Sequence, residues 1–369
     1  MQAIAQGGYM AAQVRAMLHG PNATFAFRYE LLDNTNKLKK RLGNILGASV
    51  YYTALADIKR TAKFEMEQDV DINFLTDRIK PYVRLKMSDG NWIEWPQGVF
   101  LLTSPTKKTD SAGVIRREVE AYDQLQVLID DKLDTRYTVA AGTNYITAVK
   151  TVLTGAGIIH QNLTLTSKTL PAARDWAPGT AKLQIINDLL GAINYGSLWF
   201  DENGYAIAQP YVSPSIRASE YTYRDDDESV IFPEVEQSLD LWAVPNKWVL
   251  VVSELEREPM VSTYTNSNTS SPTSTVSRGR TITDYREYQE AVDQATLDAR
   301  AQRIAFEASQ VYEHVTLETG LMPFHSHTDV FTLVFSGLGI SAKYSETSWE
   351  FEMRPGARHK HNIRRVVSI

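Results

Sequence analysis

The stretch LMPFHSHTDVFTLVF, residues 321–335, poses the question on which the fold and function of this chain depend. It is typical of a β-strand with a polar beginning, because His325, His327 and Asp329 alternate before an apolar run. Alternate residues of a strand point to the same face, so two imidazoles and one carboxylate would share a face. This pattern indicates either a metal site, and hence an enzyme, or the polar face of a structural strand. The rest of the chain has to distinguish between the two.

Composition is that of an ordinary globular chain, long enough for two or three domains. Of the 369 residues, 43% are apolar and 22% are charged, so most of the length can fold around cores. The net charge is −6 and no basic block is present, which argues against sequence-directed nucleic-acid binding. There are no cysteines, which excludes disulfides, thiolate nucleophiles and cysteine-based metal sites. No apolar stretch is long enough for a membrane span, and no signal peptide is evident.

The first large segment, residues 24–125, is rich in expected strands. Apolar and polar residues alternate in 25–33 and 58–68, and Asp89-Gly90 is a strong hairpin turn. At least six strands with short connections favour a sandwich or a small barrel. The preceding residues 1–23 are expected to form an arm or a short helix.

Residues 126–239 are expected to form a small α+β unit. Apolar residues at helical spacing predict helices over 144–154 and 180–194, the first with Thr143 as N-cap and Gly155 as C-cap. A hairpin follows, with its turn at Asn203-Gly204.

Strand character returns in 240–258 and 311–369, which we expect to form one domain together. Between them, 259–310 is expected to be an insertion. Its residues 262–277 are almost wholly Ser, Thr and Asn, which predicts a mobile loop, and the spacing within 293–310 predicts a helix.

The histidines are the main candidates for chemistry. His325, His327 and Asp329 could supply metal ligands from one strand face, and the pair His359 and His361 could supply more; His314 also lies in this part of the chain. The pair, however, lies within RHKHNIRR, where four cations would repel a metal ion. We therefore expect a structural or interface role for these histidines, with no metal and no cofactor.

Other catalytic patterns are absent from the sequence. The acidic run 225–228 lacks the spacing and the glycine of an EF-hand and is expected to be a solvated turn. Asp175, Asp201 and Glu202 could be paired as catalytic carboxylates, but only arbitrarily. The seven tryptophans and 18 tyrosines lie mostly at strand positions, which favours core or interface packing. The chain is therefore expected to be an assembly protein and not an enzyme.

Several stretches resemble the tail hub proteins of tailed bacteriophages. The resemblance is carried by ATFAFRYELLD, EWPQGVFLLTSP and VEAYDQLQVLIDDKL near the beginning, and by WAPGTAKLQIINDLLGAINYGSLWFDENGY in the middle. It continues through LDARAQRIAFEASQVYEHVTLETGLMPFHSHTDVFTLVF, where the L-M-P-x-H element precedes Asp329. The likeness covers most of the chain after residue 24, and in this family the element is a fold marker.

The resemblance implies a β-rich α+β fold with two tail-tube-like antiparallel β-barrel domains and an inserted small α+β domain. The barrels would be 24–125 and 240–258 together with 311–369. Three subunits would then form a pseudo-sixfold ring that joins the hexameric tail tube, or a distal tail protein, to a threefold tip. Spike or fibre proteins, and a tape measure protein, would be neighbours. DNA would pass through the ring without sequence-specific binding.

The implied location is the virion, in the tail, baseplate or tail tip, after assembly in the host cytoplasm. Two alternatives remain open at this point. One is a metal-dependent hydrolase that uses His325, His327 and Asp329. The other is a receptor- or glycan-binding tail-tip protein, whose aromatic residues would line an exposed groove.

Overall fold

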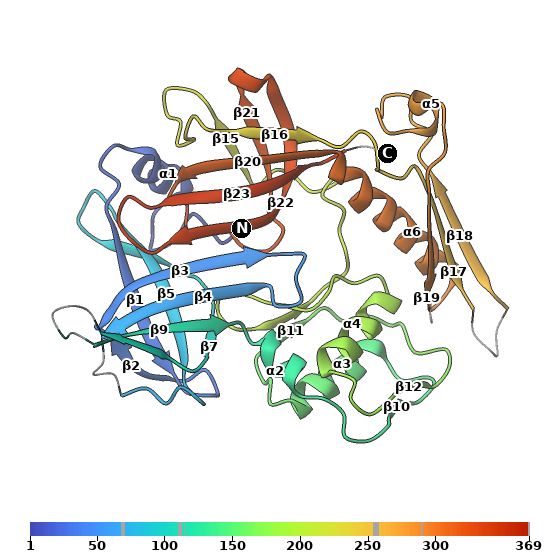
Figure 1. The fold of residues 1–369 in the computed structure, drawn as a ribbon, viewed down its shortest axis with the longest axis horizontal. Coiled ribbons are helices and arrows are strands. Elements are labelled where there is room, and N and C mark those ends of the chain that lie inside the picture. The colour runs from blue at the N-terminus through green and yellow to red at the C-terminus, as the bar shows by residue number, and fades with distance from the viewer. Residues whose placement is uncertain (68–70, 110–112, 114, 254–257, 289–290, 368–369) are drawn as a thin grey trace.

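The computed structural model describes residues 1–369 apart from 68–70, 110–112, 114, 254–257, 289–290 and 368–369 (Figure 1). Within this part the chain is β-rich, with six α-helices, one 15-stranded sheet and three small sheets. The expected β-rich α+β class is thus confirmed. No helix of the described part is long and apolar enough to cross a membrane.

The large sheet combines strands from both ends of the chain. Nine come from the first third: β1 (Phe25–Leu32), β2 (Leu38–Leu42), β3 (Ile45–Thr53), β4 (Arg60–Glu67), β5 (Arg78–Lys86), β6 (Trp92–Pro96), β7 (Phe100–Leu102), β8 (Thr106–Thr109) and β9 (Ile115–Tyr122). Six come from later: β15 (Tyr221–Arg224), β16 (Glu236–Leu239), β20 (Glu313–Gly320), β21 (Val330–Phe335), β22 (Ile340–Glu352) and β23 (Arg358–Arg365). The two sets join where β22 pairs antiparallel with β3, from Ser348 opposite Thr53 to Glu352 opposite Ser49.

Local sequence explains most of these strands. The expected hairpin at Asp89-Gly90 connects β5 to β6, and Gly90 adopts the positive φ of 89° that its turn requires. In β20 buried and half-buried residues alternate, as a strand covered on one face should show. The strand β2, at one end of the sheet, carries Lys39, Lys40 and Arg41, charges that discourage uncontrolled pairing of an open edge.

The middle unit has its own apolar core, packed around three helices. They are α2 (Leu125–Asp130), α3 (Tyr145–Gly155) and α4 (Lys182–Ala192), with small strands β10 (Tyr137–Val139), β11 (Gln161–Leu163), β12 (Arg174–Trp176), β13 (Trp199–Phe200) and β14 (Ala206–Ala208). Both expected helices are confirmed. The N-cap of α3 is Asn144, not Thr143, because the Asn144 side chain accepts hydrogen bonds from the backbone N–H groups of Ile146 and Thr147.

A third unit packs helix α6 (Gln294–Ser309) onto a three-stranded sheet of β17 (Lys247–Val252), β18 (Met260–Thr265) and β19 (Thr283–Tyr288). The helix expected over 293–310 is confirmed, with Asp293 as its N-cap. The expected grouping of 240–258 with 311–369 is wrong at the level of strand pairing, because β17 pairs with β18 and β19. An alternating apolar strand fits either sheet, and only tertiary packing selects its neighbours.

The Ser/Thr/Asn-rich stretch 262–277 also differs from the expected loop. It contains most of β18 and the short helix α5 (Thr275–Arg278). Asn266 and Ser274 are fully buried, and the amide of Asn266 donates to the Ser271 hydroxyl at 2.9 Å. Short polar side chains thus form local hydrogen bonds that replace apolar packing.

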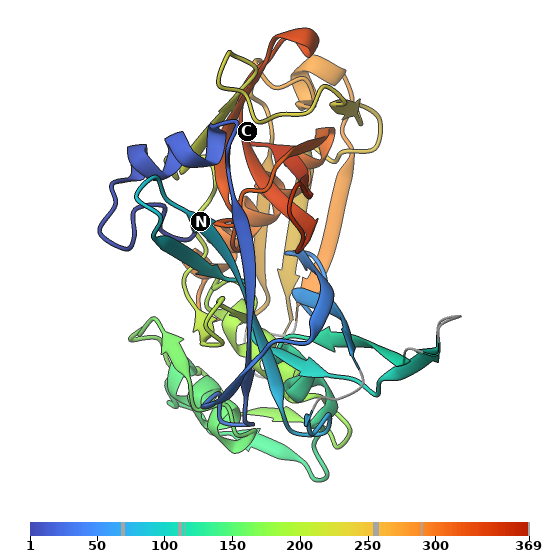
Figure 2. The ribbon, with the colours of Figure 1, turned by 90° about the vertical axis from the view of Figure 1, so that its left-hand side faces the viewer.

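Two further strands lie outside their expected domain. β15 and β16 fall within 126–239, yet they pair with β21 and β20 of the large sheet. The expected N-terminal helix is α1 (Ala11–His19), which buries Val14 and Leu18 against the sheet core. Figure 2 shows α1 outside the strands, and in both ribbon views the α2–α4 unit lies at the opposite end of the molecule from the tip of β21 and β22.

Candidate functional site: a buried histidine–carboxylate cluster

The residues of the opening stretch do not alternate along a strand. Strand β21 begins at Val330, so 325–329 forms a turn in which Thr328 has a positive φ of 49°. The turn brings His325 and Asp329 together, with 3.4 Å between Nδ1 and Oδ2. His327 lies apart, because it hydrogen-bonds the Tyr52 hydroxyl and stacks on Trp199 at 4.4 Å between ring centroids. The predicted three-residue face is therefore wrong.

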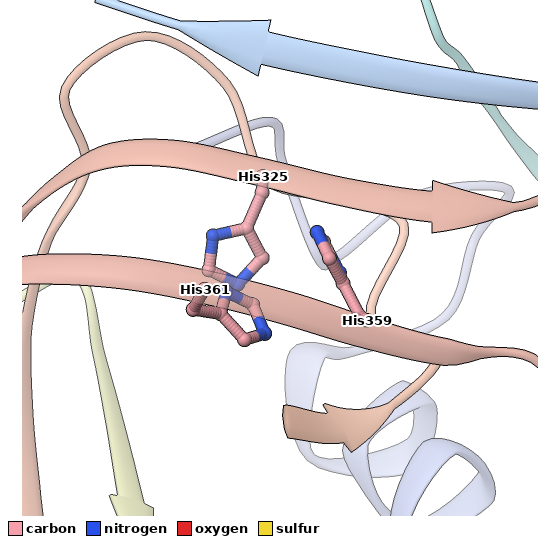
Figure 3. A group of neighbouring side chains, drawn as sticks. All are labelled: His325, His359 and His361. Atoms are coloured by element: carbon pink, nitrogen blue, oxygen red, sulfur yellow. The ribbon is translucent and has the colours of Figure 1, made fainter. Parts of the chain in front are cut away.

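Instead, His325 meets two histidines of β23 (Figure 3). It also meets Glu346, a glutamate of β22. Ring centroids lie 5.0 Å apart for His325 and His359, 4.7 Å for His325 and His361, and 4.2 Å for His359 and His361. We call His325, Asp329, Glu346, His359 and His361 the histidine cluster. Each of the five is at most 1% exposed.

Strand alternation explains how β23 delivers both imidazoles inside. His359 and His361 face the core, whereas Arg358 and Lys360 face outward and pair with glutamates on neighbouring strands. The expectation that these cations surround the histidines and repel a metal ion is therefore wrong. Arg358, Lys360 and Arg364 lie on the opposite face of the strand, and Arg365, which has the parity of the histidines, is paired with Glu313 at 2.8 Å.

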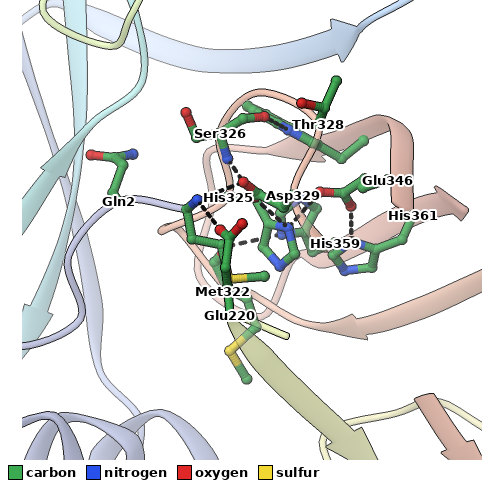
Figure 4. A network of polar contacts seen from close by, with 12 residues as sticks. Gln2, Glu220, Met322, His325, Ser326, Thr328, Asp329, Glu346, His359 and His361 are labelled. Atoms are coloured by element: carbon green, nitrogen blue, oxygen red, sulfur yellow. Dashed lines mark hydrogen bonds and ion pairs between the residues drawn. The ribbon is translucent and has the colours of Figure 1, made fainter. Parts of the chain in front are cut away.

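Glu346 organises the cluster as a hydrogen-bond acceptor (Figure 4). Its carboxylate accepts the Nδ1–H of His325 at 2.6 Å and that of His361 at 2.7 Å. This fixes Nε2 of His325 as the acceptor of the Tyr223 hydroxyl at 2.7 Å, and Nε2 of His361 faces the Thr319 hydroxyl at 3.0 Å.

His359 is held differently. Its Nδ1–H donates to the carbonyl of Met322 at 3.0 Å, and its buried Nε2 has no hydrogen-bond partner among the residues that the structure describes. Burial lowers the pKa of all three imidazoles, that of His361 to about 3. The rings are therefore neutral at pH 7.

The α-amino group of Met1 closes the cluster on the other side. It lies 2.6 Å from Oδ1 of Asp329 and 2.5 Å from Oε2 of Glu220, which also pairs with Arg217 (Figure 4). Burial raises the pKa of Asp329 to about 7, and the ammonium group opposes that rise. The pKa of Glu346 is likewise raised by burial.

The pKa shifts predict how stability depends on pH. Folding lowers the pKa values of the imidazoles. Their contribution to the free energy of unfolding is therefore fully present above the unfolded pKa of about 6.5 and is lost as the pH falls below it. Folding raises the pKa values of the Asp329 and Glu346 carboxyl groups. Between about pH 4 and their folded pKa values these two groups therefore favour the folded state more as the pH falls. Three imidazoles outweigh one or two carboxyl protons, so acid destabilises the fold.

The cluster has donors for a metal but not the access that catalysis needs. Ligand atoms of the three histidines lie within 4.8 Å of one another. Glu346, however, already occupies Nδ1 of His325 and of His361, and the side chains are sealed from solvent. A hydrolytic metal centre keeps a position open for water and substrate. The geometry instead cross-links β22, β23, β15 and the turn at 325–329.

Sequence reasoning missed Glu346, Tyr223 and the buried ion pair of Arg60 with Glu202, whose Nη2 and Oε1 lie 2.8 Å apart. Glu346 escapes the pattern because a β-bulge between 346 and 348 breaks the alternation of β22, so that Tyr344, Ser345 and Glu346 are buried in succession. Arg60 and Glu202 are 142 residues apart, and no local signal connects them.

The other candidates have ordinary structural roles. The acidic run 225–228 is a turn, as expected, in which Asp225 accepts hydrogen bonds from the backbone and hydroxyl of Ser336. His314 is half-buried on β20, outside the cluster. Among the tryptophans, Trp95, Trp248 and Trp349 are core residues at most 1% exposed, whereas Trp242 is 75% exposed.

Comparison with solved structures gives the class of fold. The chain has the fold of phage tail and baseplate-hub-like proteins, and a PdpA-VgrG complex shares this fold. No family model and no curated protein matches its sequence.

Several solved structures match almost the whole of this chain. The tail protein from Neisseria meningitidis MC58 is 12% identical with a TM-score of 0.65, covering 92% of this chain and 96% of its own. The 43 kDa tail protein of prophage MuSo2 from Shewanella oneidensis is 11% identical with a TM-score of 0.63, covering 92% and 98%. A Francisella PdpA-VgrG complex matches at 10% identity and a TM-score of 0.56, over 95% of this chain and 53% of that one.

Proposed function

We propose that this protein is a non-enzymatic structural component of a phage tail, a homotrimeric hub between tail tube and tail tip. The observation that carries the proposal is the likeness in fold to two phage tail proteins over 92% of the chain. Its partners would be the tail tube or a distal tail protein on one side and spike or fibre proteins on the other. A tape measure protein is a further proposed partner, and the tail of the virion is the proposed location.

The proposed role as an adaptor between sixfold and threefold symmetry requires two barrel-like domains in each chain. We assign the first to 24–125 and the second to 311–369 together with β15 and β16. Support comes from the β22–β3 junction, where the two halves pair edge to edge through five residue pairs. If similar edges meet between subunits, three chains would present six similar units to a hexameric tube.

The proposed passage of DNA rests on charge. Three copies at −6 each carry −18, and an acidic lumen would repel the phosphate backbone and prevent sticking. A lumen that is basic in an assembled ring would contradict this part of the proposal.

The alternative of a metal-dependent hydrolase loses its structural basis. His327 lies apart from His325 and Asp329, and the latter two are closed off from solvent. The structural role of the histidine cluster accounts for the same residues through their hydrogen bonds.

The test is an image of the assembled tail in which this chain is located, with a count of its copies. We expect three copies in one ring at the junction between the tube and the tip. Six copies, a single copy, or a position in the capsid would refute the proposed hub. The assembled particle is the right specimen, since an isolated hub subunit can remain monomeric without its neighbours.

A further inference from the structure

A cavity of about 780 Å³ lies where the large sheet, the α2–α4 unit and helix α6 meet. Its walls come from the connection between β3 and β4, the segment 209–217, the last turns of α6, and strands β22 and β23. The volume is within the range of about 300–1,000 Å³ that is usual for small-ligand sites. The histidine cluster adjoins this cavity, because its member Glu346 forms part of the cavity wall.

Two hydrogen-bond donors in this wall have no partner within the described part of the chain. Gln310 is 6% exposed and its buried Nε2 is unpaired, and the buried Nε of Arg364 is also unpaired. Buried donors are nearly always satisfied, so each such exception needs an explanation. Both are N–H groups, and both would be satisfied by an acceptor inside the cavity.

The wall also carries more positive than negative charge. Arg303 is neutralised by Glu307, with 2.9 Å between Nε and Oε1, and Arg217 is paired with Glu220. Both carboxylate oxygens of Glu346 are held by imidazole N–H groups of the histidine cluster.

Two cations of the wall remain without a counter-ion among the described residues. The Nζ of Lys59 donates only to the carbonyls of Ala54 and Ala56, at 2.8 and 2.7 Å. Among the described residues Arg364 forms no ion pair: Glu307 pairs with Arg303 and acts on Arg364 only from a longer distance. Lys59 is 7% exposed and Arg364 is half-buried with a buried Nε, and buried cationic groups are normally paired, so an anion is the missing partner.

We propose that this cavity binds a small oxyanion with two negative charges, of the phosphate or dicarboxylate class, between Lys59, Gln310 and Arg364. A guanidinium group presents its donors in a fork that matches such oxygens, and an ammonium group adds a second charge. The bound anion would connect β23, the end of α6 and the β3–β4 connection. It would thereby fasten the sheet to the α6 unit.

The experiment uses the full-length protein in a chloride buffer and titrates inorganic phosphate or succinate at constant ionic strength. Calorimetry gives Kd, and thermal unfolding gives Tm. We expect either anion to bind and to raise Tm, and Arg364→Gln to weaken binding by about tenfold or more. The matched control is Arg358→Gln on the same strand, because Arg358 faces outward and pairs with Glu318 at 2.8 Å; it should bind as the unchanged protein does.

The sign of the stability change separates binding from folding defects. Without the anion, Arg364→Gln should be at least as stable as the unchanged protein, since the unpaired charge is gone. With saturating anion it should be the less stable of the two. A second variant, Gln310→Leu, should weaken binding while leaving all charges in place. The proposal is overturned if neither anion binds, or if both variants bind as tightly as the control.

Discussion

Removal of the Glu346 carboxylate is expected to destabilise the fold strongly. Glu346→Ala takes away the acceptor of two imidazole N–H groups, those of His325 and His361. A buried donor left without a partner costs about 1–3 kcal/mol, so two such donors give about 2–6 kcal/mol. Because whole proteins are stable by only about 5–15 kcal/mol, this one change would remove a large share of the stability.

A smaller effect is expected for Glu346→Gln. The amide oxygen can still accept one imidazole N–H, but the amide nitrogen would face the other. One imidazole can respond by moving its proton to Nε2, where the hydroxyl of Tyr223 or Thr319 can accept it. The cost should therefore be at most that of a single unsatisfied donor, about 1–3 kcal/mol.

The assay is urea unfolding followed by tryptophan fluorescence, with Trp349 as a probe 5.5 Å from the ring of His359. The matched control is Glu350→Ala on the same strand. Glu350 is 49% exposed and lies 3.6 Å from Lys360, a surface pair worth about 0–1 kcal/mol. If Glu346→Ala costs no more than this control, the histidine cluster does not stabilise the fold through Glu346 and the argument fails.

The remaining predictions concern acid, metal and the polar loop. Lowering the pH from about 6 to 5 should reduce the free energy of unfolding by about 1.4–2.7 kcal/mol, since the unfolded chain takes up one or two more protons than the folded one; urea titrations at several pH values measure this, and stability that rises toward acid would contradict it. Treatment with EDTA should leave Tm unchanged, because hydrogen bonds within the histidine cluster already hold its imidazoles; a stoichiometric metal, lost together with stability in His327→Ala, would revive the hydrolase alternative. Asn266→Ala should cost about 1–3 kcal/mol by urea unfolding, because the buried side-chain amide donates to the Ser271 hydroxyl and accepts from the backbone N–H of Asn268; Asn268→Ala, at a less buried position of the same loop, serves as its control.

Local patterns in the sequence were sufficient for most individual elements. The helical spacing in 180–194 and 293–310 corresponds to α4 and α6, and the turn glycines Gly90 and Gly204 lie in the hairpins they predicted. These features depend on residues within a few positions of one another, so the chain alone determines them. The β-rich class follows from the same local information.

Which strands become neighbours was not contained in those patterns. β17 and β20 both alternate buried and half-buried residues, yet β17 pairs with β18 and β19, and β20 with β16 and β23. Pairing depends on contacts between residues far apart in the chain, whose energies a local period does not carry.

The sequence by itself determined that histidines gather near the end of the chain, and that no cysteine or familiar catalytic motif accompanies them. Only the tertiary structure decided that His327 is separated from His325, and that Glu346 and the two histidines of β23 take its place. The physical reason is that a turn, a bulge and a sheet register together set the direction of each side chain. These three features arise from packing of the whole fold, in which nearly all buried polar groups must find a partner.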